Sequence, residues 1–236
     1  MEKIDYEKCS IPQRFEKEIL SSFGSQTLKK NEDLLSSLKH ENNNNKKCIF
    51  MSKLIKNLLA DNNEEDIKDC FVNVRHDLSV NDFQWAKEMY LECESIEDFA
   101  IKIQKMQIQE MQNCMDTGKE WYGMKITGEI MEYVNSDPYI FYGIPVGNKI
   151  IAKAIPCNLT EFLKSKTDNE KQYNACHCEY AKESIKNGER VSPLLCYCSL
   201  GHTMVLWEAV FSKKLKGKVI KSALIGDNEC VFEIEL

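Results

Sequence analysis

Two Cys-x-Cys pairs lie close together in the C-terminal third of the chain. The first consists of Cys176 and Cys178, the second of Cys196 and Cys198, and 17 residues separate them. That interval is long enough for a helix and a returning loop, so four thiols can converge on one tetrahedral ion. Thiolates are soft ligands that suit zinc or an iron centre, and binding such an ion adds free energy to folding. The spacing therefore predicts a metal site.

A fifth cysteine, Cys230, lies near the end of the chain. Residues 176–230 hold five of the 11 cysteines, whereas the other 181 residues hold six. Five thiols exceed the four positions around a tetrahedral ion, so one member of the 176–198 set is expected to stay outside the metal's own ligands. Two other interpretations stay open: the thiols are buried core side chains, or one of them is a redox or nucleophilic residue.

Two histidines accompany the cysteines. His177 separates the first pair, and His202 follows Cys198 by four residues. Each can be a metal ligand, a general base beside a thiolate, or a polar side chain at a helix end. On the same stretch, Trp207 is expected in the core and Glu208 on a solvated flank, although a carboxylate there can also bind a metal or act as an acid.

The elements that must position these residues are two β-hairpins and the helices between them. Residues 139–155 form two β-rich runs around the Gly147-Asn148 pair, with Pro145 inside the first run. We expect a short helix over 158–166, a second helix that ends at Gly188, and a third over about 200–213. These helices frame both cysteine pairs.

The second hairpin closes the chain. Residues 218–225 and 229–236 alternate in polarity on either side of a Gly-Asp-Asn turn. The alternation places Cys230, Phe232 and Ile234 on the inward face. Four strands with helices on one side predict an α+β sandwich.

The first 115 or so residues differ in pattern. Ser79 and Ser95 each stand three residues ahead of an aspartate, an arrangement that caps helix N-termini, and apolar residues follow at helical spacing. The asparagine tract at 42–45 predicts an exposed loop. We therefore expect a mainly helical region over 1–120 and an α+β domain over 121–236. The predicted fold class is α+β, with a helical N-terminal half followed by an antiparallel four-stranded sheet packed against helices.

Composition and charge exclude several classes of protein. Hydrophobic residues make up 43% of the chain and charged residues 29%, which is typical of a globular protein. We find no apolar run long enough to predict a membrane span and no secretory signal, so a cytoplasmic location is expected, where the 11 cysteines would be thiols or metal thiolates. The net charge of −6 argues against nucleic acid as a partner.

The C-terminal residues resemble the 4-vinyl reductase domain superfamily. The similarity lies in the Cys-Tyr-Cys run at 196–198, the Trp-Glu pair at 207–208 and the Gly-Asp-Asn-Glu-Cys-Val-Phe run at 226–232, within about residues 170–236. The superfamily includes sensor domains of phenol-responsive activators and proteins related to bacteriochlorophyll biosynthesis. The paired motifs are also similar to bacterial proteins described as aminothiazoline carboxylate hydrolase-like. The resemblance implies a small apolar ligand held near a zinc site.

The chain departs from those sensors in its ligand set. The sensors take zinc ligands from a cysteine before the helix, a glutamate and a cysteine on the next strand, and a cysteine on the last strand. Cys198 and Cys230 match the first and last positions, but residues 219–224 contain neither Glu nor Cys. Two ligands of the sensor pattern are therefore missing, and the additional cysteines, Cys176, Cys178 and Cys196, could replace them.

Three functional hypotheses follow. The leading one is a small-molecule-binding or sensor-like protein, in which thiolate-bound zinc fixes the loops around a pocket between the sheet and the helices. Tyr197, Trp207 and Phe232 would help to line or support this pocket. Its ligand would be small and apolar or heterocyclic, and a homodimer is compatible with the sequence. The alternative is a hydrolase of a small heterocyclic or amide substrate, with a cysteine nucleophile and His177 or His202 as base, or with metal-activated water. The third is an interaction module without a small ligand.

Overall fold

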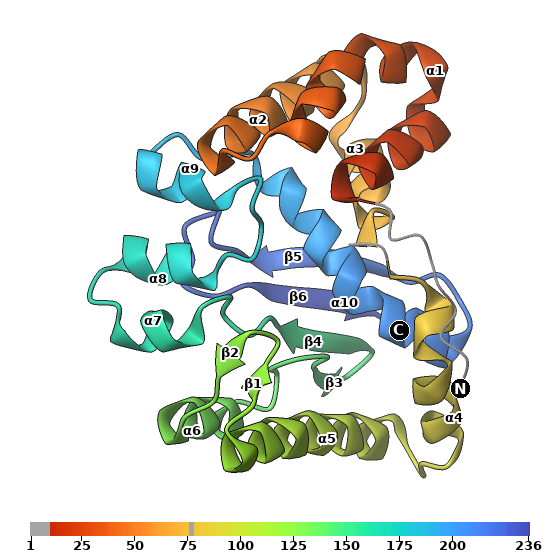
Figure 1. Cartoon of the computed structure of the whole chain (residues 1–236). Coiled ribbons are helices and arrows are strands. Elements are labelled where there is room, and N and C mark those ends of the chain that lie inside the picture. The colour runs from red at the N-terminus through yellow and green to blue at the C-terminus, as the bar shows by residue number, and fades with distance from the viewer. Residues whose placement is uncertain (1–9, 76–77) are drawn as a thin grey trace.

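Helices form the first half of the computed structural model, which describes residues 10–75 and 78–236 (Figure 1). Both predicted serine caps are in place: Ser79 and Asp82 form a capping box, and the Ser95 side chain accepts a hydrogen bond from the backbone N–H of Asp98 at 3.1 Å. The helical N-terminal half is thereby confirmed. Its helices are α1 (Ile11–His40), α2 (Asn44–Asp61), α3 (Glu64–Val72), the 3-10 helix η2 (Val80–Phe83), α4 (Gln84–Leu91) and α5 (Ile96–Thr117).

The asparagine tract is only partly a loop, in contrast to the expectation. Residues 41–43 separate α1 from α2, but Asn44 and Asn45 already belong to α2. The side chain of Asn43 accepts a hydrogen bond from the backbone N–H of Lys46 at 3.2 Å. Because this bond satisfies a free donor of the first turn, the tract begins a helix instead of extending a loop.

The second half contains the predicted antiparallel four-stranded sheet, in the order β3-β4-β6-β5. Val146 pairs with Lys149 across the predicted first turn, and Pro145 is tolerated because β3 is an edge strand. A small hairpin, β1-β2, was not expected. The elements are β1 (Glu120–Trp121), β2 (Met124–Lys125), α6 (Gly128–Ser136), β3 (Ile144–Val146), β4 (Lys149–Lys153), α7 (Leu159–Lys164), α8 (Asp168–Ala175), α9 (Lys182–Asn187), the 3-10 helix η3 (Pro193–Leu195), α10 (Cys196–Phe211), β5 (Lys216–Lys221) and β6 (Val231–Glu235).

Helix α10 is the centre of the fold. It begins at Cys196, four residues before the expected start, because Ser192 caps the preceding turn and Pro193 occupies its first position. The segment Pro193–Phe211 is long and apolar enough to cross a membrane, with a mean hydropathy of 1.4, but 72% of its most apolar stretch is buried inside the fold. This burial is typical of the core helix of a soluble protein.

Close packing fixes α10 against its neighbours. A Cβ atom added at Gly201 would lie 1.8 Å from the backbone oxygen of Val72, so only glycine fits where α10 crosses the end of α3. On its other side α10 contacts η2, α4 and β5.

Buried side chains connect the two halves of the chain. One core joins α1, α2 and α3 to α9, the start of α10 and the loop after β5. A second joins α4 and α5 to α10 and the four-stranded sheet, and a third joins the end of α5 to β1, α6 and α7. The helical half thus packs directly on the α+β part, and the division of the chain at residue 120 stays a prediction.

Candidate functional site

Three separate chain segments bring the five predicted cysteines into one core. Cys176 and Cys178 follow directly after α8, Cys196 and Cys198 lie in the first turn of α10, and Cys230 immediately precedes β6. Cys176 and Cys198 are buried members of the core that includes α1 to α3, and the other three pack against it. We call these five residues the cysteine cluster. Figure 1 shows the connections that carry them on the side of the sheet where α8 and α9 lie.

The thiols of the cluster affect one another's ionisation. Burial raises the pKa of Cys178 well above its usual value, and Cys176, Cys198 and Cys196 raise it further. Burial is also the main cause that raises the pKa of Cys196, with added effects from Cys230, Cys176 and Cys198. All five residues therefore lie in one electrostatic neighbourhood, with Cys178 and Cys196 near its centre.

Backbone N–H groups face three of the sulfur atoms. The N–H of Cys178 faces the thiol of Cys176, the N–H of Tyr180 faces Cys178, and the N–H of Ala223 faces Cys230. Each acts to lower the pKa of the thiol that it faces, although burial outweighs it and raises the pKa of Cys176 to about 12. Donors aimed at sulfur stabilise the thiolate, which is the form that binds metals.

The connection between β5 and β6 is held in one conformation beside the cluster. The backbone oxygen of Ser222 accepts hydrogen bonds from the N–H groups of Ile225, Gly226 and Asp227 at 3.0, 3.2 and 3.0 Å. In return, a carboxylate oxygen of Asp227 accepts a hydrogen bond from the N–H of Ser222 at 3.0 Å. The Ser222 hydroxyl faces the thiol of Cys196. The predicted turn is therefore part of a wider loop, residues 222–230, which supports the site.

Two side chains fasten this loop to the helices. Gln172 of α8 donates a hydrogen bond to the backbone oxygen of Gly226 at 2.6 Å, and Arg190 donates to both the backbone oxygen of Ala223 and the side chain of Gln172. Gln172 is buried. We did not anticipate either residue, because its partners lie far along the chain and no local pattern marks it.

A sixth cysteine, Cys157, lies beside the cluster. It is among the groups that raise the pKa of Cys176, and its backbone N–H donates to the carbonyl oxygen of Ala175 at 3.4 Å. Cys157 follows the first predicted hairpin, 19 residues before Cys176, and it has no partner at a metal-ligand spacing. The topology of the sheet brings it to the site.

The two histidines lie at the edge of this region. The Nε2 of His177 donates a hydrogen bond to the backbone oxygen of Ile155 at 2.6 Å, so this nitrogen already has a backbone partner. His177 and His202 each keep an exposed face, yet desolvation by surrounding protein lowers the pKa of both rings. His177 also contributes to the lowered pKa of His202, which places the two rings near each other.

Glu208 is buried, which corrects the expectation of a solvated flank. One of its carboxylate oxygens lies 2.7 Å from Nη2 of Arg75, and the other accepts a hydrogen bond from the N–H of Leu215 at 3.1 Å. The ammonium of Lys214 lies 3.9 Å away. Glu208 lies ten residues after Cys198, which corresponds to roughly 15 Å along the helix axis, so Glu208 is not a candidate ligand for the cluster.

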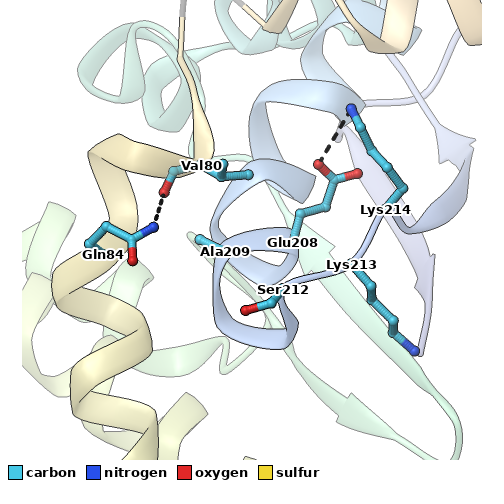
Figure 2. A pocket seen from close by; sticks show the side chains of 7 residues that line it. All are labelled: Val80, Gln84, Glu208, Ala209, Ser212, Lys213 and Lys214. Atoms are coloured by element: carbon cyan, nitrogen blue, oxygen red, sulfur yellow. Dashed lines mark hydrogen bonds and ion pairs between the residues drawn. The ribbon is translucent and has the colours of Figure 1, made fainter.

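Figure 2 shows Glu208 among the side chains that line a hollow at this end of α10. The hollow has a volume of about 340 Å³, and we call it the α10 hollow. Its walls come from η2, the start of α4 and the end of α10. The lining residues are Val80, Gln84, Glu208, Ala209, Ser212, Lys213 and Lys214.

The three aromatic residues expected to line or support a pocket all lie in or against the second core. Trp207 and Phe232 are fully buried in the second core, as expected for Trp207, and the indole N–H of Trp207 donates to the backbone oxygen of Tyr142 at 2.8 Å. Tyr197 is half-buried, with the ammonium of Lys68 5.6 Å from its ring centre. None of the three aromatic residues lines the α10 hollow.

The cluster is not a completed coordination sphere. Within residues 10–75 and 78–236, no group of three or more His, Cys, Asp or Glu side chains is arranged to hold a metal ion. No disulfide is seen among the cysteines of this part of the chain. The thiols are thus gathered in one core as reduced side chains whose sulfurs would have to draw together around an ion.

Comparisons with known proteins do not assign a family. No protein-family model, no curated protein and no solved structure matches this chain. The interpretation of the cluster therefore depends on the chemistry of its residues.

Proposed function

We propose that the chain is a small-molecule-binding, sensor-like protein whose cysteine cluster holds zinc as thiolates. The observation that supports this proposal most directly is the convergence of five thiols from three chain segments in one core. The resemblance to the 4-vinyl reductase domain superfamily agrees with it, since those sensors pair zinc with a small apolar ligand. We place the protein in the cytoplasm, where thiols stay reduced.

The donor set fits zinc. Without a cation, burial keeps Cys178 and Cys196 protonated, because a thiolate in this core would have no compensating charge. A bound dication supplies that charge and favours loss of the thiol protons, and the N–H groups that face the sulfurs would then stabilise the thiolates. Soft sulfur ligands select zinc over the hard cations magnesium and calcium, and iron is the other metal that such a set can bind.

Four of the five cysteines would complete a tetrahedral site. Cys178 and Cys196 each have three other cluster cysteines among the groups that shift their pKa, so we expect both among the four ligands. Four protein ligands would leave no open position, so the metal would be structural. It would tie the end of α8, the start of α10 and residues 222–230 together.

The alternative is a hydrolase of a small heterocyclic or amide substrate. A cysteine nucleophile reacts as the thiolate, and the raised pKa values of Cys176, Cys178 and Cys196 oppose that form in the absence of a cation. A metal-activated water would require one ligand position to stay open. Because five thiols are available for four positions, we consider the structural metal the better-supported role.

Metal analysis of protein purified without oxygen tests the proposal. We expect about one zinc per chain, and we expect Cys178→Ser and Cys196→Ser to lose most of it. Cys114→Ser is the matched control, because Cys114 packs against the third core and is not a member of the cluster. Absence of zinc and iron from the unmodified protein would refute the proposal, and so would full occupancy in both cluster variants.

A further inference from the structure

A second hollow lies next to the cysteine cluster. It has a volume of about 380 Å³, within the range of about 300 to 1,000 Å³ that is usual for small-molecule sites. The β1-β2 hairpin, the residues leading into α7 and the first residue of α9 form its walls. We call it the β1-β2 hollow, and it is lined by Tyr122, Gly123, Met124, Lys125, Cys157, Asn158, Thr160 and Lys182.

The hollow carries two positive charges without acidic partners. Lys125 and Lys182 both line it, and neither forms an ion pair with a carboxylate of the described residues. The ammonium of Lys182 lies 4.6 Å from the ring centre of Tyr173. The Tyr173 hydroxyl in turn donates a hydrogen bond to the carboxylate of Glu183 at 2.7 Å. Glu183, the acidic residue next to Lys182 in the sequence, therefore already has a partner. The two ammonium groups are therefore available to an anion.

The remaining walls combine neutral polar groups with an apolar surface. Thr160 contributes a hydroxyl, and the side-chain oxygen of Asn158 accepts the N–H of Glu161 at 3.3 Å, which leaves its NH2 group as a donor. Met124 and the exposed ring of Tyr122 supply apolar surface on the hairpin. A free inorganic anion would leave this surface uncovered, whereas an anion attached to an organic body would cover it.

The hollow is in contact with the surroundings of the cluster. Cys157 lines it and is also a neighbour of Cys176. The charge of Lys182 is among the groups that act on both Cys176 and His177. An anion bound near Lys182 would therefore lie close to the chain segment that carries the first cysteine pair.

We infer that the β1-β2 hollow binds a small organic carboxylate. Lys182 and Lys125 pair with the carboxylate, Thr160 and Asn158 offer hydrogen bonds, and Met124 and Tyr122 contact its apolar or ring-shaped body. This inference deepens the proposed function, because it gives the small ligand a charge and a location outside the aromatic core. Its site shares no residue with the cysteine cluster, so the two claims can fail separately.

Calorimetric titration of the full chain with benzoate tests the inference, because benzoate joins a carboxylate to an apolar ring. Benzamide has the same shape without the charge, and inorganic phosphate has the charge without the ring. We expect benzoate to bind, and Lys182→Met to weaken it at least tenfold. Lys186→Met is the matched control, because Lys186 lies 3.4 Å from the ring centre of Tyr173 but does not line the hollow.

The outcomes are distinct. Benzoate binding that is lost in Lys182→Met and retained in Lys186→Met, with benzamide at least tenfold weaker, supports the inference. No benzoate binding, equal binding of benzamide, equal loss in both lysine variants, or binding of phosphate alone would overturn it. Zinc content measured on the same samples tells this result apart from failure of the metal proposal, because the lysine variants keep all five cysteines of the cluster.

Discussion

The two ends of helix α10 hold buried chemical groups that are satisfied in different ways. Near its end, Glu208 has an arginine at 2.7 Å, a backbone N–H at 3.1 Å and a lysine at 3.9 Å. At its beginning, Cys196 and Cys198 lie among other thiols, and burial together with the neighbouring cysteines raises the pKa of Cys196 and Cys178. The glutamate end therefore has its counter-charges within the folded protein, whereas the thiols of Cys178 and Cys196 would gain a nearby positive charge from a bound cation.

Removing the metal should cause the largest loss in the free energy of unfolding. A ligand present at 1,000 times its dissociation constant stabilises the folded state by about 4 kcal/mol, so chelation should lower the free energy of unfolding by about that amount or more. Urea unfolding with and without chelator measures it. Readdition of zinc should restore the original value, and an unchanged midpoint after verified metal removal would show that the cysteine end is complete by itself.

Removing the charge of Glu208 should lower the free energy of unfolding by about as much as chelation does, without changing the zinc content. Glu208→Gln leaves the buried guanidinium of Arg75 without its charged partner, which typically costs about 3 to 5 kcal/mol. Glu161→Gln is the control, because its pair with Lys164 is exposed and should contribute about 1 kcal/mol or less. Urea unfolding gives both values. Equal small losses in the two variants would mean that Glu208 does not stabilise this end of α10, and a loss of zinc in Glu208→Gln would mean that the two ends are not independent.

The close contact between α10 and α3 can be disturbed separately from both ends of α10. Gly201→Ala places a Cβ atom 1.8 Å from the backbone oxygen of Val72, so we expect a loss of about 1 to 3 kcal/mol from forced movement of α3. Gly128→Ala is the matched control, since Gly128 is helical and has open space around its Cβ position. Thermal unfolding compares them. If both substitutions are neutral, the close contact between α3 and α10 does not fix the helix.

Removing a side chain that supports the loop at residues 222–230 should have the smallest effect on the free energy of unfolding. It should nevertheless weaken zinc binding clearly. Gln172→Leu removes the hydrogen bond to the Gly226 carbonyl and the one accepted from Arg190, which together should cost about 1 to 2 kcal/mol. Loss of such an outer hydrogen bond typically weakens metal binding about 10- to 100-fold. Competition with a coloured zinc chelator measures the affinity. Unchanged affinity would show that the cysteines hold the ion without help from the Gln172 side chain.

Local patterns in the sequence predicted much of the fold. The serine caps at α5 and η2, the Gly147-Asn148 turn and the alternation of the last strand each act within a few residues, so their signals survive in a single sequence. They were sufficient to predict a helical half followed by an antiparallel four-stranded sheet. The short β1-β2 hairpin has only two residues in each strand, too few to show an alternating pattern.

The surroundings of the site were not predictable in the same way. Cys157 approaches Cys176 only because the sheet returns the chain, and Gln172 meets Gly226 across 54 residues. Glu208 was expected in solvent because a carboxylate on a helix is usually exposed, but Arg75, far away in the sequence, covers it. These partners depend on the packing of distant elements, about which a helical or alternating pattern carries no information.

X-ray absorption at the zinc edge on anaerobically purified protein tests the central claim most directly. A zinc ion held by the cysteine cluster should show about four sulfur neighbours at about 2.3 Å. Cys114→Ser should give the same spectrum, whereas Cys178→Ser should lose the signal or replace one sulfur with a lighter atom. Zinc surrounded mainly by nitrogen and oxygen, or a spectrum that Cys178→Ser leaves unchanged, would contradict the account.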